Sequence, residues 1–229
     1  MPKKVLARCS RCTVPEEERS CVNSKGRGAP GCPTLMRKNV TREANREYAI
    51  GDIREFARQA SIQESSCYAG REQKPYVLHP TKPRIQEICE FAQRMGYNRL
   101  GLAYCVGLAL EALLVDRVLS AQGFEVISVC CKVGSVPKET IGIADDEKIN
   151  IGDYESMCNP VGQAKILNDA GTHFNIALGL CVGHDSLFFK YADAPTTVLA
   201  AKDRVLGHNP LGALYTSRSY YERLLRKGF

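Results

Sequence analysis

The chain has 229 residues, 11 of them cysteine, and a formal net charge of +6. This length fits one medium α/β domain with a small appendage, and an odd number of thiols cannot all pair within one chain. There is no signal-peptide pattern at the start and no apolar run near the roughly 18 residues that span a bilayer. These features argue against a secreted disulfide scaffold and a membrane protein, and we expect a cytoplasmic protein in a reducing compartment.

Four cysteines dominate residues 1–40, where they are spaced C-x2-C-x8-C-x10-C at Cys9, Cys12, Cys21 and Cys32. The residues between them are mostly charged or are glycine and proline, so this segment cannot fold by burying apolar surface. Four converging thiolates are typical of a metal site, and a bound metal would supply the missing folding energy. We therefore predict a cysteine-rich metal-binding module over residues 1–40, with zinc and an iron–sulfur cluster both left open.

The positive charge is concentrated in the same segment. Residues 1–40 hold nine Lys or Arg and three Glu, whereas the remainder holds 22 residues of each sign. Such charge offsets the thiolates of a metal site, and it also suits an acidic partner or nucleic acid. Because residues 1–40 contain no aromatic side chain for base stacking, the pattern disfavours nucleic acid.

Apolar residues recur at helical spacing from 42 to 63, which predicts a helical linker over residues 41–75. From residue 76 to 229 helices and strands alternate, as is typical of a parallel sheet with right-handed crossovers. The expected strands are 99–104, 124–130, 174–180 and 196–201, within a sheet of about five strands. The expected helices are 83–95, 108–121, 161–168, 187–192 and a last one from Asn209 toward Arg226. Residues 133–154 are expected to form an irregular surface excursion.

Two stretches of the α/β part resemble each other. FAQRMGYNRLGLAYCVG (91–107) and ILNDAGTHFNIALGLCVG (166–183) both predict a helix, a turn with glycine, a strand and then Cys-Val-Gly. We interpret them as parts of two related βαβ-type halves. The predicted fold class is therefore α/β, a Rossmann-like parallel sheet with an N-terminal cysteine-rich module.

Ligands of open α/β sheets bind beyond the carboxyl ends of the strands, and several thiols are predicted at that edge. Adjacent strand residues point to opposite faces, so Cys130 and Cys131 cannot easily act together, and Cys131 is nearer the tip. Cys89, in contrast, lies in an apolar helical stripe and is interpreted as a small buried hydrophobe. The cofactor-binding residues expected at this edge are Cys67, Cys105, Cys131, Cys158 and Cys181.

Four or five thiolates at one edge favour an iron–sulfur cluster, with [4Fe–4S] the leading choice. Zinc with four cysteines would be closed and structural, and a Cys105–Cys181 dithiol pair is another interpretation. Lys132 and Lys202 lie near strand ends, where they would balance an anionic cluster. His184 follows Cys181 by three residues and suits either this pocket or a simple helix start. There is no glycine-rich phosphate-binding motif.

Five segments resemble a family of uncharacterised cysteine-rich metal-binding proteins from anaerobic bacteria and archaea, which is defined by a domain of unknown function. The resembling segments are CSRC…C…CP, AYCVGLALEA, VCCKVG, MCNPVGQA and GLCVGHDSLFFKYADAPTTVLAAKDRVLGHNPLGALYTS. The resemblance covers most of the chain and implies metal binding, without naming a reaction. The cysteines on strand-to-helix loops are also similar to those of cluster-bearing Rossmann-like domains in anaerobic redox enzymes, by analogy of fold.

These observations predict an iron–sulfur protein of anaerobic redox chemistry. It would exchange electrons with a redox partner protein or act reductively on a small molecule, and the sequence does not decide whether it is an oxidoreductase or a carrier. One alternative is a structural zinc module on a scaffold that binds a partner protein or nucleic acid. Another is a thiol-based enzyme without a cluster. The catalytic residues and the oligomeric state stay open, a homo-oligomer included.

Overall fold

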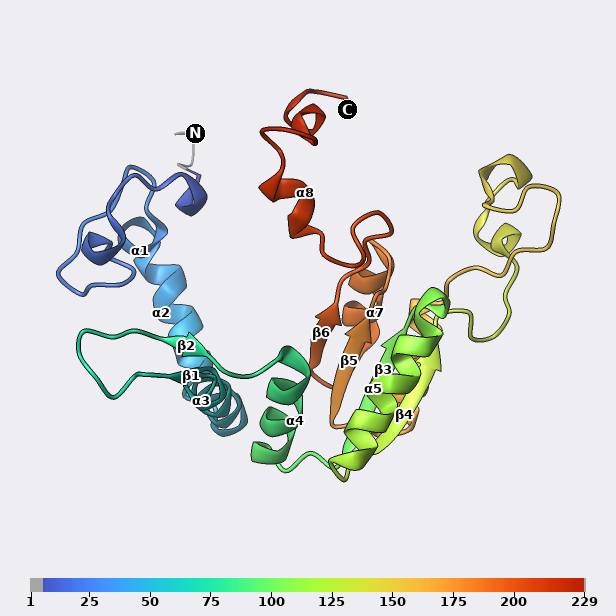
Figure 1. Ribbon diagram of the computed structural model, residues 1–229, viewed down its shortest axis with the longest axis horizontal. Helices are drawn as coiled ribbons and strands as arrows, with labels where there is room; N and C mark the ends of the chain where they lie inside the picture. The colour runs from blue at the N-terminus through green and yellow to red at the C-terminus, as the bar shows by residue number, and fades with distance from the viewer. Residues whose placement is uncertain (1–5, 229) are drawn as a thin grey trace. The chain divides into compact units, whose positions relative to one another are not determined.

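The computed structural model describes residues 6–228 (Figure 1). The chain divides into two compact units, Met1–Glu64 and Ser65–Phe229. In the described part of the chain, no helix combines the length and apolar character needed to cross a bilayer.

The first unit is built from short helices and turns. Its 3-10 turns are Cys9–Arg11 and Glu16–Glu18, and its α-helices are α1 (Pro33–Met36), α2 (Lys38–Glu47) and α3 (Gly51–Ser66), the last ending past the unit boundary. Among residues 6–50, Val14 is the only buried hydrophobic side chain. The unit therefore has almost no apolar core near its cysteines, as the composition predicted.

The single helix expected over residues 42–63 is wrong, because α2 and α3 are separate. After Glu47 the backbone tightens, with the N–H groups of Ala49 and Ile50 donating to carbonyls three residues earlier. Gly51 then begins α3, and Asp52 lies in its first turn, where a carboxylate suits the positive end of the helix dipole. The apolar periodicity continues through this turn, so it could not reveal the break.

The second unit contains a parallel four-stranded sheet in the order β4-β3-β5-β6. Its strands are β3 (Arg99–Tyr104), β4 (Glu125–Cys130), β5 (Phe174–Leu178) and β6 (Thr196–Ala200). The fold class is α/β as predicted, with four parallel strands rather than about five. A separate two-stranded ribbon pairs β1 (Tyr68–Ala69) with β2 (His79–Pro80).

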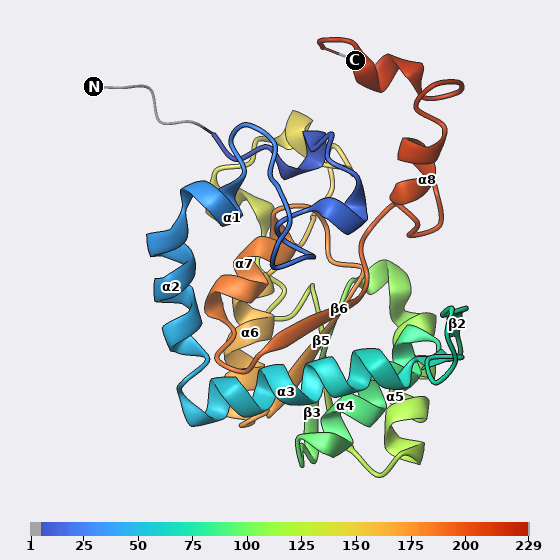
Figure 2. The same cartoon turned by 90° about the vertical axis from the view of Figure 1, so that its left-hand side faces the viewer.

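Helices cover both faces of this sheet (Figure 2). The helices α6 (Pro160–Asp169) and α7 (His184–Tyr191) cover one face, and α4 (Arg84–Arg94) and α5 (Ala109–Ala121) cover the other. Strands β3 and β5 are buried because apolar residues point to both faces, as is usual for a parallel sheet. The core residues with no exposed surface include Leu100, Leu102, Leu119, Leu167, Ile176 and Phe188.

The strand order creates a switch point between β3 and β5. From β3 the chain passes through α5 to β4 on one side, and from β5 it passes through α7 to β6 on the other side. The two βαβ-type segments therefore lie on opposite sides of the line between the central strands. In such sheets a crevice opens at the carboxyl ends of these two strands, where ligands bind.

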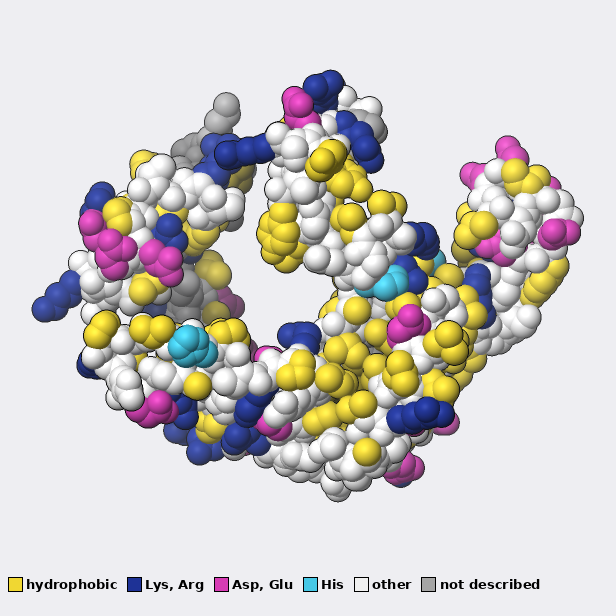
Figure 3. All heavy atoms as spheres, viewed as in Figure 1, with side chains coloured by type: hydrophobic (Ala, Val, Ile, Leu, Met, Phe, Trp, Pro, Cys, Tyr) yellow, Lys and Arg dark blue, Asp and Glu magenta, His cyan; other side chains and the backbone are white. Residues whose placement is uncertain are grey.

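A long irregular segment joins β4 to α6 in the second unit. The irregular excursion expected over residues 133–154 extends over residues 132–159 in the structure, with 3-10 turns at Lys138–Ile141 and Asp145–Glu147. Acidic and apolar side chains gather on it (Figure 3), among them the exposed Ile141, Ile149 and Ile151.

The long last helix expected from Asn209 toward Arg226 is wrong. Only α8 (Leu211–Tyr215) and a 3-10 turn at Glu222–Leu225 form, and Pro210 rather than Asn209 is the N-cap residue of α8. The reason lies at Thr216, whose hydroxyl donates to the carbonyl of Gly212 while its own carbonyl accepts from Tyr221. Hydroxyl side chains that bond to the backbone compete with the regular helical pattern.

Candidate functional site

The carboxyl edge of the sheet gathers reactive side chains from several strands. Cys105 directly follows β3, Cys131 directly follows β4, and Lys202 lies two residues after β6. Their backbones are held together, since the N–H of Cys105 donates to Leu178 and that of Cys131 donates to Tyr104. The hydrogen bonds between the strands thus continue to Cys105 and Cys131, and they fix the backbone positions from which the two side chains extend.

Three thiols meet at this edge, and we call Cys105, Cys131 and Cys158 the three-thiol cluster. The Sγ atoms of Cys131 and Cys158 are 3.9 Å apart, and Cys131 also hydrogen-bonds Cys105. The backbone N–H of Val106 donates to the Cys131 sulfur over 3.3 Å. Cys131 therefore lies between the other two, in a nearly closed environment that leaves it 3% exposed.

The contacts within the cluster lower the pKa values of two of its thiols and raise the pKa of the third. Hydrogen bonding to Cys131 lowers the pKa of Cys105 to about 4, with further help from the Gly107 N–H and from Lys202. Cys131 likewise lowers the pKa of Cys158 to about 6, and the charges of Lys132 and His184 act in the same direction. The same two contacts, together with burial, raise the pKa of Cys131. The cluster therefore favours two thiolates around one protonated thiol.

Lys202 contacts Cys105, and its side chain passes close to two glycines. A Cβ on Gly107 would lie 3.9 Å from the Lys202 Nζ, and one on Gly179 would lie 3.8 Å from its Cε. Gly179 also has φ +61° and closely approaches the Leu108 side chain, so a larger residue would be strained there. The ammonium of Lys202 therefore lies beside the Cys105 thiolate, at the switch point between β3 and β5.

Gln163 supports the site through hydrogen bonds to the ends of two strands. It was not identified from the sequence. It is fully buried on α6, and its Nε2 donates to the carbonyls of Tyr104 at 3.1 Å and Val129 at 2.7 Å. These carbonyls belong to the ends of β3 and β4, next to the cysteines. A glutamine on the apolar face of a helix that covers a sheet was the available signal, because buried amides need partners.

The remaining expected thiols lie elsewhere or face other groups. Cys130 points to the Tyr104 side chain, so Cys131 and not Cys130 joins the cluster. The Sγ of Cys181 accepts a hydrogen bond from Arg204 Nη2 over 3.1 Å. Cys67 is buried after α3, and its carbonyl accepts from both the N–H and the hydroxyl of Thr81. Cys89 is buried on α4, where burial raises its pKa.

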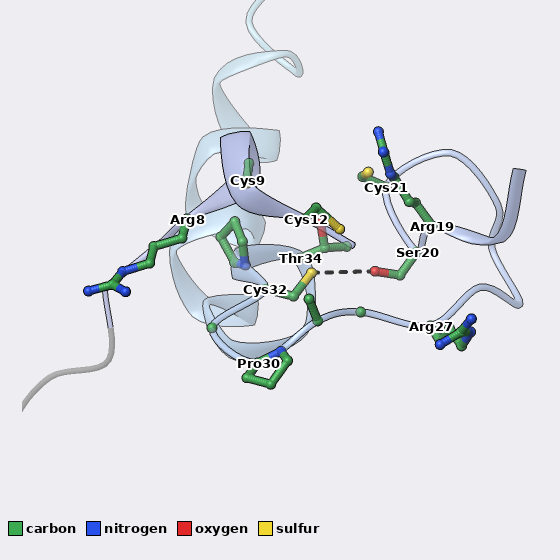
Figure 4. A pocket seen from close by; sticks show the side chains of 14 residues that line it. Arg8, Cys9, Cys12, Arg19, Ser20, Cys21, Arg27, Pro30, Cys32 and Thr34 are labelled. Carbon is green, nitrogen blue, oxygen red and sulfur yellow. Dashed lines mark hydrogen bonds between the residues drawn. The ribbon is translucent and has the colours of Figure 1, made fainter. Parts of the chain in front are cut away.

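All four cysteines of the first unit line one cavity of about 110 Å³ (Figure 4). Cations also line it, namely Arg8, Arg19 and Arg27. The Sγ of Cys32 lies 3.5 Å from the Ser20 hydroxyl, and this bond, with the backbone N–H groups of Leu35 and Thr34, lowers the pKa of Cys32. The four cysteines and the three arginines therefore surround one hollow, although the Arg27 guanidinium is paired with the Glu18 carboxylate at 2.7 Å.

Backbone contacts close the loop that carries these cysteines. Arg27 donates its N–H to Glu18, and Ser20 donates to Arg27, which folds the chain back between Cys21 and Cys32. This close pairing requires Gly26, since a Cβ there would be 2.5 Å from the Glu18 carbonyl oxygen. Gly28 is equally confined, with a Cβ position 2.9 Å from the Cys32 sulfur.

Within residues 6–228, no group of three or more His, Cys, Asp or Glu side chains is arranged to hold a metal ion in this conformation. In the second unit the thiols contact one another instead, so metal binding there requires the cysteine side chains to turn. The donor types fit soft or borderline metals, since thiolates select zinc and iron–sulfur clusters. The thiols that lie together and the charges around them therefore fit such a metal.

Comparison with known proteins places the chain in a family. Residues 32–199 match the model described as "Protein of unknown function (DUF1847)", and the chain belongs to this family. It is also 43% identical, over 192 residues, to the "Uncharacterized protein MJ0455" of Methanocaldococcus jannaschii, covering 84% of this chain and 91% of that protein. The family match covers β3, β4, β5, all of β6 except Ala200, and the three-thiol cluster, and the family description assigns no activity.

Proposed function

We propose that this protein binds metal through two cysteine sets and works as an iron–sulfur protein in redox chemistry. Its role would be electron transfer to a partner protein or a reductive step on a small molecule. The observation that carries the proposal is the three-thiol cluster, in which Cys105, Cys131 and Cys158 come from three separate segments to one sheet edge. Structural thiols rarely need to converge at the place where α/β folds bind ligands.

The positive charges around the three-thiol cluster support the binding of an anionic cofactor. Lys202 contacts Cys105, and Lys132, whose ammonium donates to the Ser156 carbonyl, lies near Cys158. An iron–sulfur cluster held by thiolates is negatively charged, and its reduction potential depends on nearby charge and hydrogen bonds. When bound, the cluster would supply one-electron chemistry, while the lysines stabilise its negative charge and the buried core beneath excludes water.

The cavity in the first unit is proposed as the second metal site. Cys9, Cys12, Cys21 and Cys32 supply four thiolates, which suits either structural zinc or an iron–sulfur cluster. Arg8 and Arg19 line the cavity and would offset part of the thiolate charge, while Arg27, which also lines it, is paired with Glu18. Because residues 6–50 have a single buried apolar side chain, metal binding would contribute much of the stability of this unit.

The experiment is to purify the full chain without oxygen and measure iron, sulfide, zinc and the visible spectrum. The decisive variants are Cys105→Ser for the sheet edge and Cys9→Ser for the first unit, with Cys89→Ser as the matched control. We expect Cys105→Ser to remove about four irons and four sulfides and to leave the metal of the first unit in place. Cys89→Ser should change neither. Wild-type protein without iron, or equal iron in all variants, would refute the iron–sulfur proposal.

A second candidate is a thiol-based enzyme without a cluster, and the lowered pKa values favour it. Cys105 and Cys158 are thiolates near neutral pH, and each touches the protonated Cys131. A thiolate beside a second thiol is the arrangement used for thiol–disulfide exchange. Iron-free wild-type protein that reduces a small disulfide, and loses this activity in Cys131→Ala, would favour this candidate instead.

A further inference from the structure

The three-thiol cluster lacks one group for a four-ligand set. The sequence pointed to Cys181 as that group, since it follows β5 as Cys105 follows β3. In the structure the Cys181 sulfur instead accepts a hydrogen bond from Arg204. Arg204 is fixed by its own loop, where the Asp203 carboxylate accepts from the N–H groups of Val205 and Leu206. Cys181 is therefore engaged by a cation of the β6 loop.

His184 is the other candidate from the same connection. It is the first residue of α7, and its backbone N–H donates to the carbonyl of Cys181 over 3.0 Å. This bond sets the helix start at the carboxyl edge of the sheet. His184 is among the groups that lower the pKa of Cys158, so its ring lies on the Cys158 side of the cluster.

The Nδ1 atom of His184 is buried and has no hydrogen-bond partner. Only four side-chain atoms of residues 6–228 are in this state, and three of them belong to residues around the cluster. They are the Oγ of Ser156, two residues before Cys158, the Oε1 of Gln163, which braces the strand ends, and the Nδ1 of His184. Native proteins satisfy nearly all buried polar groups, so these three atoms have unused capacity to bind a further partner.

The structure assigns His184 as the fourth ligand at the sheet edge, through Nδ1, beside Cys105, Cys131 and Cys158. This inference rests on the proposed function and specifies its metal site as a Cys₃His set, with Cys181 outside it. Imidazole is neutral where a fourth cysteine would be a thiolate, so the bound centre would carry one negative charge less. A histidine ligand of this kind raises the reduction potential relative to an all-cysteine site.

The test uses full-length protein whose first site is removed by Cys9→Ser and Cys12→Ser. The protein is reconstituted with ferrous iron and sulfide, reduced, and examined by pulsed electron paramagnetic resonance for nitrogen coupling. We expect a strong imidazole nitrogen coupling in this background and in Cys181→Ala, and its loss in His184→Ala. His79→Ala, at an exposed histidine of β2, should keep the coupling unchanged.

His184→Cys controls for the possibility that His184→Ala loses the coupling only because it misfolds, since a cysteine can occupy the same ligand position. We expect this variant to keep its iron, to lose the nitrogen coupling and to show a lower reduction potential. Coupling that persists in His184→Ala, or iron that is lost in Cys181→Ala but not in His184→Ala, would overturn the assignment while leaving the iron–sulfur proposal intact. Absence of any iron at the sheet edge of the background protein would overturn both.

Discussion

Asn159 donates its backbone N–H to the carbonyl of Cys131 over 2.7 Å. This bond joins the two ends of the long excursion between β4 and α6, so Cys158 lies against Cys131 although 27 positions separate them. The Asn159 side chain also accepts from Gly162 as the N-cap of α6 and donates to the Val133 carbonyl. One asparagine therefore starts a helix and closes the loop that completes the three-thiol cluster.

The reactivity of Cys158 should depend on Cys131. In metal-free, reduced protein, we expect the alkylation rate of Cys158 to have a midpoint near its pKa of about 6. The thiolate is the reactive form, so the rate should fall as the pH drops below this value and level off above it. In Cys131→Ala the midpoint should move up toward the ordinary 9.0, because the largest lowering contact is removed.

Mass spectrometry of peptides after short alkylation pulses at each pH measures this midpoint. Cys130→Ala is the matched control, since its side chain faces Tyr104 rather than the cluster. It should leave the Cys158 midpoint in place. An unchanged midpoint in Cys131→Ala would mean that the contact between the two sulfurs does not set the pKa.

Gln163 should contribute to stability through two strand ends at once. Gln163→Leu keeps much of the side-chain volume but leaves the carbonyls of Tyr104 and Val129 without this donor. Buried groups that lose a partner cost about 1–3 kcal/mol each, so we expect a loss of unfolding free energy of about 2 kcal/mol or more. Urea unfolding measures it, with the exposed Gln93→Leu on α4 as control. Equal stability of the two variants would contradict the bracing role.

The strands of the sheet could be predicted closely because burial on both faces leaves continuous apolar runs. RLGLAY coincides with β3 at Arg99–Tyr104, and the apolar run at 174–180 contains β5, which ends two residues earlier. Helix ends were harder. The break between α2 and α3 lies within an uninterrupted apolar pattern, and the last helix stops where the Thr216 hydroxyl bonds to the backbone. Such local competition is not visible in periodicity.

Part of the candidate site followed from topology and part did not. Cysteines at strand ends must reach the same edge of a parallel sheet, so Cys105 and Cys131 could be placed together from the sequence. Which side chain fills the next position depends on loop contacts. Arg204 holds Cys181 through a bond between two loops, and the buried position of the His184 Nδ1 atom depends on where α7 begins. Neither contact has a signature in residue spacing.

Gly28 should be essential to the cavity of the first unit. In Gly28→Ala the new Cβ would lie 2.7 Å from the Cys32 Cβ and 2.8 Å from the Leu35 side chain. Cys32 would then have to move, and we expect metal affinity to fall about ten- to a hundredfold, as when groups that position ligands are lost. Competition with a chromogenic chelator measures the affinity.

The control for this prediction is Gly51→Ala at the start of α3, where nothing lies within 4 Å of the new Cβ. That variant should bind metal as the wild type does. Unchanged affinity in Gly28→Ala would show that Cys32 does not take part in the site.

The excursion after β4 should loosen in acid because of one ion pair. Lys138 Nζ lies 2.7 Å from a Glu155 carboxylate oxygen, and both side chains are largely buried. The other carboxylate oxygen accepts from the N–H groups of Ile149 and Asn150. The Lys138 contact and these bonds lower the pKa of Glu155 from 4.5 to about 2. Because the folded pKa is depressed, the stabilisation is complete above about pH 5, declines below 4.5 and is gone once the pH falls past about 2.

Hydrogen exchange of the amides of residues 137–156 measures this opening. In the wild type, opening should increase as the pH falls from 5 to 2, after correction for intrinsic exchange rates. Glu155→Gln should open severalfold more at pH 7 and lose most of this acid dependence, since no carboxylate is left to protonate. Asp146→Asn, in the same excursion, is the control and should retain the wild-type profile. If Glu155→Gln kept the wild-type acid profile, the acid sensitivity would have to come from the Glu139 and Asp145 carboxylates that surround Lys148.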